Sequence, residues 1–137
     1  MVHSVSHISI FLLVLISYLT ILCEGKVLFF PIRHVHLKNN LGDGVNLQVH
    51  CKSGDDDLGV HNVTHGADYE FQFRVNIFGT TQFFCGLVWN NKLHYIDAYI
   101  HKRDKQRCGP DCFWTIKQDQ ACLYNYHTRS QDCIAYK

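Results

Sequence analysis

The side chains of this chain that can form covalent bonds, bind metal ions or transfer protons are its cysteines, its histidines and a run of aspartates. Six cysteines follow the apolar start of the chain: Cys51, Cys85, Cys108, Cys112, Cys122 and Cys133. An even number of cysteines in a short exported chain is typical of a disulfide framework. Spacing alone leaves the connectivity open, but Cys122 and Cys133 flank a polar hairpin segment, so we expect that pair first. A zinc site on Cys108 and Cys112 is the alternative, and it lacks a second pair of ligands.

The histidines raise the question of metal binding or catalysis. His34 and His36 alternate along one strand and so share a face, and His50 can approach them from a neighbouring strand. Outward-facing histidines are more often plain surface residues. A ribonuclease would need a motif that the chain lacks, and no nucleophile with a base is evident. We therefore expect no catalytic residue, no metal and no cofactor.

Two charged segments are candidates for contact with a partner. The first is Asp55, Asp56 and Asp57, which follow an alternating strand within Val49–Gly59. Calcium binding would need the D-x-D-x-D-G spacing, which is absent, so a solvated loop is the expected structure. The second segment carries Lys102, Arg103, Lys105 and Arg107, which are basic and either contact a partner, bind anionic glycans or lipid head groups, or form an ordinary solvated loop.

One sequon for N-linked glycosylation occurs after the apolar start, at Asn62-Val63-Thr64. A sequon that is used must lie on the surface of a protein that enters the secretory route. Asn62 is therefore a candidate glycosylation site.

The start of the chain has the features of a signal peptide. Ile8 to Leu22 is almost wholly apolar, and small residues follow at Cys23-Glu24-Gly25. About 15 apolar residues are fewer than the ~20 that a spanning helix needs. We predict a signal peptide over residues 1–25 and one small domain over residues 26–137, with no membrane insertion after cleavage.

The charge of the chain does not indicate nucleic-acid binding. The formal net charge is only +1, and the sequence lacks the basic stripe that is typical of a nucleic-acid binder, so we expect no nucleic-acid partner.

The remaining chain has short alternating runs separated by Gly, Asn and Asp, which is typical of an all-β domain. Seven or eight strands are expected: 27–37 with a break at Pro31, 45–51, 69–75, 81–89, 93–101, 113–117, 121–126 and 133–137. Asn90-Asn91 predicts a tight hairpin turn. These segments predict a small, disulfide-stapled antiparallel β-sandwich.

The aromatic residues divide into expected core and expected surface. Trp89 and Trp114 follow the inward phase of their strands and lie near cysteines, so we expect both in the core. Tyr95 and Tyr99 share the phase of Asp97, which predicts an exposed aromatic strip.

Several of these segments together resemble the plant self-incompatibility S1 family, also called S-protein homologues. The resemblance lies in V-H-C-K-S-G-D-D-D-L-G at Val49–Gly59, G-A-D-Y-E-F-Q-F at Gly66–Phe73, T-Q-F-F-C at Thr81–Cys85 followed by Trp89, and C-x-x-x-C-x-W-x-I at Cys108–Ile116. These motifs cover essentially the whole domain. The chain departs from the family pattern at Asp119-Gln120, where Asp-Gly is usual. Cys122 and Cys133 look like additions to a four-cysteine set, which supports their mutual pairing.

The resemblance implies a secreted, non-enzymatic extracellular ligand for a plasma-membrane receptor, as for the poppy stigma proteins that pollen perceives. Specificity is expected mainly in the loops around His101–Arg107 and His127–Asp132, while the acidic triplet stays open between an architectural role and partner recognition. The protein is expected to be a monomer. A carbohydrate-binding or antimicrobial defence module is the alternative from another class. An enzyme comes third.

Overall fold

The chain divides into two units, of which the first is a single helix. The computed structural model describes residues 2–27 and 30–137, and the units are Met1–Pro31 and Ile32–Lys137. Helix α1 (Val2–Val27) fills most of the first unit. No helix in the described residues has the length and hydropathy needed to cross a membrane. The prediction that the first strand begins at Val27 is wrong, because Val27 is helical. Leu28 and Phe29 of the same expected strand lie outside the described residues.

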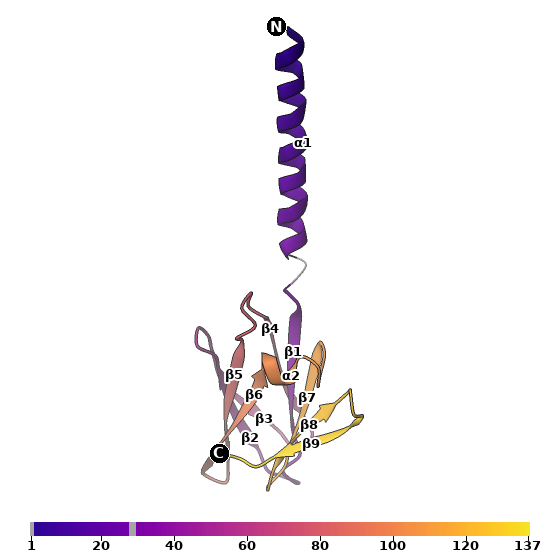
Figure 1. Cartoon of the computed structure of the whole chain (residues 1–137). Helices are drawn as coiled ribbons and strands as arrows, with labels where there is room; N and C mark the ends of the chain where they lie inside the picture. Colours follow the sequence, from indigo (N-terminus) through magenta and orange to yellow (C-terminus); the bar gives the residue numbers. More distant parts are fainter. Residues whose placement is uncertain (1, 28–29) are drawn as a thin grey trace. The chain divides into compact units, whose positions relative to one another are not determined.

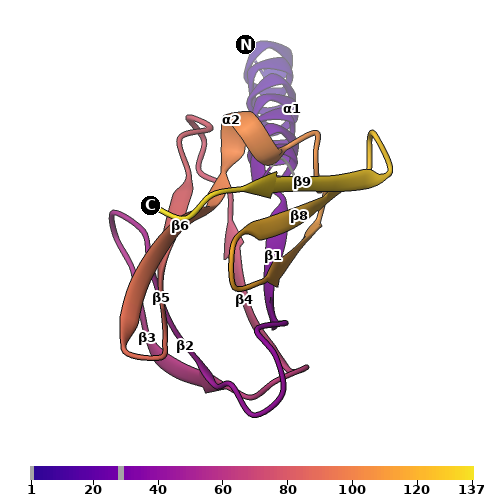
Figure 2. The same cartoon turned by 90° about the horizontal axis from the view of Figure 1, so that it is seen from below.

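The second unit is a sandwich of two β-sheets (Figures 1 and 2). The first sheet has the order β4-β1-β7-β8-β9, with β4 (Asp68–Arg74), β1 (Ile32–Asn39), β7 (Asp111–Ile116), β8 (Ala121–Asn125) and β9 (Ser130–Ile134). The second has the order β3-β2-β5-β6, with β3 (Asp57–Val63), β2 (Leu47–Lys52), β5 (Gln82–Trp89) and β6 (Lys92–Ile100). A four-residue helix, α2 (His101–Asp104), follows β6. The predicted all-β sandwich is confirmed.

Two details of the sheets differ from expectation. The described residues form nine strands, because β3 occupies a stretch expected to be loop and surface sequon. Strand β3 is an edge strand whose side chains are mostly exposed, so it lacks the alternation that reveals a half-buried strand. Strands β1 and β7 run parallel, whereas all other neighbours are antiparallel.

The core lies between the two sheets and is built from alternating positions. Leu37 of β1 and Leu87 of β5 are fully buried, and each such side chain contributes about 1.5–3 kcal/mol through burial. Trp89 and Trp114 are also buried, as predicted. The indole Nε1 of Trp114 donates a hydrogen bond to the carbonyl of Ala98 at 2.8 Å, so this buried polar group is satisfied.

All six cysteines of the second unit form disulfides. Cys51–Cys85 joins β2 to β5, and Cys122–Cys133 joins β8 to β9; in both pairs the residues lie directly opposite each other with a Cα–Cα distance of 4.0 Å. Cys122–Cys133 is the pair expected first from the sequence. The third bridge, Cys108–Cys112, closes a short loop that leads into the start of β7.

The three bridges should differ in their contribution to stability according to the length of chain that they close. Replacing both cysteines of a bridge by alanine should lower the free energy of unfolding by about 4, 3 and 2 kcal/mol for loops with sequence separations of 34, 11 and 4 residues. Urea unfolding of the three double variants measures this order. A Cys108–Cys112 variant less stable than the Cys51–Cys85 variant would contradict it.

An irregularity in β6 overturns the expected aromatic strip. Phe84 pairs with Asp97 whereas Phe83 pairs with Tyr99, so β6 has one extra residue at this point. The extra residue reverses the phase of the strand. Tyr99 is therefore fully buried, while Tyr95 remains 44% exposed.

Candidate functional site

Three connections meet at one end of the sandwich, which we call the loop end: residues 53–56, 75–81 and 101–110. Lys52 pairs with Phe84 and Gln82 pairs with Ile100, so β2 and β6 end where β5 begins. The amide of His101 donates to the carbonyl of Thr81 at 3.1 Å, which joins the second connection to the third. The two charged segments predicted from the sequence therefore lie at the same end, together with a connection that the sequence analysis did not single out.

The turn between β2 and β3 holds two aspartates in the solvent. The Ser53 hydroxyl accepts hydrogen bonds from the amides of Asp55 (3.3 Å) and Asp56 (3.0 Å), and the Ser53 amide donates to the Asp56 carbonyl at 2.8 Å. Within the described part of the chain, neither the Asp55 nor the Asp56 carboxylate has a hydrogen-bond or ion-pair partner. Both carboxylates are exposed on an ordered backbone and are free to meet a cation.

Asp57 has a different role, because its carboxylate is used within the fold. It accepts hydrogen bonds from the Gly59 amide at 2.9 Å and from His50 Nε2 at 2.6 Å, and Lys52 Nζ lies 3.9 Å away. The Gly59 hydrogen bond, assisted by His50, holds the pKa of Asp57 below its usual value of 3.8. The acidic triplet thus divides into two displayed residues and one structural residue.

The lowered pKa of Asp57 predicts a pH-dependent contribution to stability. The unfolded chain takes up a proton at this carboxyl at a higher pH than the folded chain does. The contribution is therefore present above about pH 4 and is lost as the pH falls through the folded pKa. Asp57→Asn should flatten this part of the acid-unfolding profile, followed by circular dichroism, whereas Asp56→Asn should leave it unchanged. Identical profiles for wild type and Asp57→Asn would contradict the assignment.

The loop between β4 and β5 presents two large apolar side chains to the solvent. Ile77 is 67% exposed and Phe78 is 81% exposed, the latter being the highest value among the large apolar side chains described. The loop is ordered by its own hydrogen bonds, since Asn76 bonds both Thr80 and Thr81. The sequence does contain a signal for this feature, which is the apolar pair in the turn segment N-I-F-G. A search for the alternating apolar residues of strands does not detect such a pair.

Gly79 fixes this loop against the third connection. Its φ of +65° is in the left-handed region, and a Cβ at this position would lie 3.2 Å from Cδ2 of His101. Burial and the nearby charges of Arg33 and Lys105 lower the pKa of His101, which favours the uncharged ring at this contact. Any residue other than glycine would strain the backbone, and its Cβ would require the His101 ring to give way by a few tenths of an ångström.

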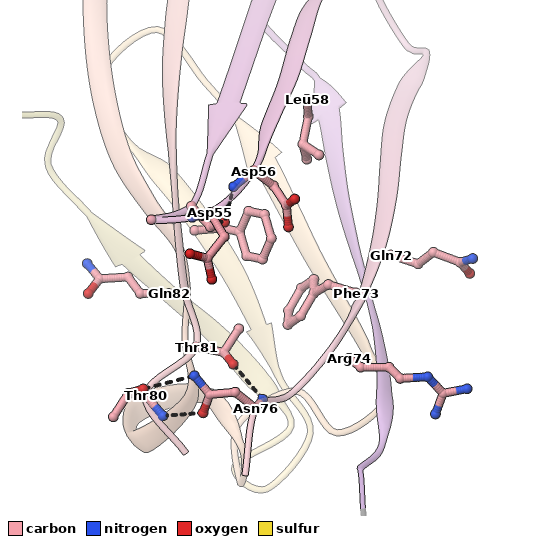
Figure 3. Close-up of a pocket in the computed structure, with 13 residues that line it drawn as sticks. Asp55, Asp56, Leu58, Gln72, Phe73, Arg74, Asn76, Thr80, Thr81 and Gln82 are labelled. Carbon is pink, nitrogen blue, oxygen red and sulfur yellow. Dashed lines mark hydrogen bonds between the residues drawn. The ribbon is translucent and has the colours of Figure 1, made fainter. Parts of the chain in front are cut away.

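A cleft of about 560 Å³ lies between the first two connections (Figure 3). Asp55 and Asp56 border it on one side and Asn76, Thr80 and Thr81 of the second connection on the other, with Phe73 between them. Phe83 also lines the cleft. The rings of Phe73 and Phe83 are 4.6 Å apart, and Phe73 also meets Tyr99 at 4.8 Å. The cleft therefore combines an aromatic floor fixed by the core with a lining that carries the carboxylates of Asp55 and Asp56 and the guanidinium of Arg74.

The basic segment is only partly a display loop, which corrects the sequence interpretation. Asp104 is completely buried and accepts hydrogen bonds from the Ile100 amide (2.8 Å) and from Arg103 Nε (2.7 Å) and Nη2 (2.8 Å). Arg103 also lies over the Trp114 ring, with its guanidinium carbon 5.8 Å from the ring centroid. Arg107 bonds Asp132 at 3.0 Å.

Arg103 and Arg107 therefore form ion pairs within the fold, and their side chains are only 26% and 20% exposed. Lys102 and Lys105 are exposed, so they remain candidates. Their position at the loop end places positive charge on the same end as the displayed carboxylates of Asp55 and Asp56.

The three histidines considered as metal ligands do not converge. His34 Nδ1 bonds Glu70 at 2.9 Å, and His36 Nε2 bonds Asp111 at 3.2 Å, on the outer face of the first sheet. His50 belongs to the second sheet, where it bonds Asp57. Among the described residues no group of three or more His, Cys, Asp or Glu is placed to hold a metal ion.

The candidate glycosylation site is accessible. Asn62 and Thr64 are both exposed, with Asn62 in edge strand β3. Asn62 lies opposite Gln48 of β2, on the outer face of the second sheet.

Comparison with known proteins gives consistent similarities. Residues 34–136 match the family described as plant self-incompatibility protein S1. The chain is 34% identical over 132 residues to S-protein homolog 29 of Arabidopsis thaliana, covering 96% of each chain. It is 36% identical over 123 residues to self-incompatibility protein S1 of Papaver rhoeas, covering 88% of this chain and 85% of that protein.

The fold is also similar to that of a solved structure. That structure is described as one of the self-incompatibility protein homologues, a widespread family of small, highly stable, secreted plant proteins. The TM-score is 0.63 at 19% identity, covering 80% of this chain and 98% of the other.

Proposed function

Because this chain belongs to the plant self-incompatibility S1 family, we propose that it is a secreted extracellular ligand recognised by a receptor in the plasma membrane of a target cell. Residues 1–25 serve as the signal peptide, and residues 26–137 form the released domain. The solved relative is described as secreted, which supports this route.

The observation that carries the proposal is the exposure of Ile77 and Phe78 on an ordered loop. Large apolar side chains displayed together mark contact sites, and aromatic anchors that enter a partner's pocket dominate binding energies. The loop is ordered before binding, so little entropy is lost when it docks. The disulfides and the core beneath it supply the rigid support.

The charges across the cleft from the second connection indicate the chemistry of the partner. Asp55 and Asp56 have carboxylates without partners in the described chain, so a basic group on the receptor would be complementary to them. Such charges steer association and set specificity more than they add affinity. The receptor surface should therefore offer an apolar pocket for Phe78 next to lysine or arginine side chains.

The chemistry of the cleft supports binding and not catalysis. The hydroxyls of Ser53, Thr80 and Thr81 already accept hydrogen bonds from the Asp55 and Asp56 amides and from Asn76. Among the residues that the structure describes, no histidine lines the cleft to act as their base. The proposal is therefore a non-enzymatic ligand that acts as a monomer.

Binding to intact plant cells tests this function. Fluorescently labelled, oxidised protein should bind pollen or seedling cells saturably, should be displaced by excess unlabelled protein, and should lose its sites when the cells are first treated with protease. Reduced and alkylated protein is the control without the fold. Binding that never saturates, or that survives protease treatment of the cells, would overturn the proposal.

A further inference from the structure

A second apolar surface lies away from the loop end, on the outer face of the second sheet. A groove of about 250 Å³ there is bordered by Val60, Phe84, Leu93 and Tyr95, which are between 40% and 54% exposed. These residues come from strands β3, β5 and β6. The recognition surface at the loop end does not include them.

Gly86 creates the depth of this groove. It lies in the middle of β5 between His50 and Tyr95, and a Cβ here would point at Leu93 Cδ1 and Tyr95 Cε1, each 3.5 Å away. The absence of a side chain at this position leaves the floor of the groove at the level of the β5 backbone.

The sequon Asn62 belongs to the same face. Asn62 pairs with Gln48, Gln48 with Val88 and Val88 with Leu93, so these residues form one row across the sheet. Neighbouring strands lie about 4.8 Å apart, so Val88 is roughly 10 Å from Asn62 along the row. A group attached to the Asn62 side chain can therefore reach the groove by lying over β2.

We propose that Asn62 carries an N-linked glycan whose first sugars lie across this groove and cover Leu93 and Tyr95. The apolar face of a sugar ring can pack on these side chains, while its hydroxyl edge meets the polar side chains of Gln48 and His50. The inference rests on the secretory route in the proposed function.

The charge of the groove favours a neutral occupant. Lys52, the cation at its border, lies 3.9 Å from Asp57, and His50 bonds the same carboxylate. The charges at this border are thus compensated within the protein. N-linked core sugars carry no charge and need no counter-ion on the protein.

Hydroxyl-radical labelling of the protein secreted by cultured plant cells tests this inference. Tyr95 is 44% exposed and Tyr126, which lies in the turn between β8 and β9 and does not line the groove, is 48% exposed, so Tyr126 is a matched internal reference. Glycosylated wild type should show Tyr95 and Leu93 labelling several-fold slower than the Thr64→Ala and Asn62→Gln variants, with Tyr126 labelling equal in all three. Both variants remove the glycan, and they alter different side chains.

The outcomes are distinguishable. Peptide mass spectrometry that finds Asn62 unmodified in the secreted protein overturns the inference, as does equal labelling of Tyr95 with and without the glycan. In the latter case the groove is open to another occupant, such as an external glycan or a second copy of the chain. Either result leaves the receptor proposal intact, whereas absence of the protein from the medium would count against that proposal.

Discussion

Replacing Ile77 and Phe78 by serine is expected to lower receptor affinity by about 2–4 kcal/mol, or roughly 30- to 1000-fold in Kd. The two side chains are 67% and 81% exposed. Their removal takes away the apolar anchor of the proposed interface without opening a cavity in the core. Competition against the labelled wild type on intact cells measures the loss, and the thermal unfolding temperature should remain close to that of the wild type.

Phe113→Ser is a matched control for this double variant. Phe113 is 39% exposed on the outer face of the first sheet, where it stacks on His36 at 4.3 Å. This variant also loses an exposed aromatic ring, but it should compete as well as the wild type. Equal competition by the Ile77→Ser/Phe78→Ser protein would remove the loop end from the interface.

The second large effect is expected on stability, from Asp104→Ala. The substitution leaves the Arg103 guanidinium and the Ile100 amide without the buried carboxylate that they now bond. Breaking a buried ion pair by removing one partner costs about 3–5 kcal/mol. For a domain of this size the unfolding temperature should fall by more than about 10 °C. Calorimetry or urea unfolding of the oxidised protein measures the change.

Asp43→Ala provides the exposed counterpart. The Asp43 side chain is fully exposed, with only a 3.7 Å approach to His65, and surface charges of this kind contribute little. Its free energy of unfolding should stay within about 0.5 kcal/mol of the wild type. Similar losses in the two aspartate variants would mean that the Asp104 network is not a stabilising element.

Strong local patterns explain the part of the fold that the sequence predicts well. Strand β2 alternates clearly from Leu47 to Cys51, and the structure buries its apolar positions. Asn90 and Asn91 adopt φ values of 50° and 61°, as the expected hairpin turn requires. In both places short-range preference and tertiary burial agree.

The features that the sequence did not predict depend on contacts that form only in the folded domain. Asp104 is buried because Arg103 and the end of β6 bond its carboxylate. The sequence shows only four consecutive charged residues at positions 102–105, which predict a solvated loop. The extra residue in β6 that buries Tyr99 is visible only in its pairing with β5. The exposure of Phe78 depends on the position of residues 75–81 at the loop end. The sequence does not show this, because the same apolar pair could equally have been part of the core.

Photo-crosslinking from position 78 tests the central claim that the loop end meets a cell-surface receptor. A photoreactive phenylalanine replaces Phe78 in one labelled protein and Asn91, at the hairpin turn at the opposite end of β5 and β6, in another. On intact target cells the position 78 probe should yield a cross-linked membrane protein that excess unlabelled wild type suppresses, and the position 91 probe should not. Equal cross-linking of that protein from both positions, or none from position 78 under conditions of saturable binding, would contradict the account.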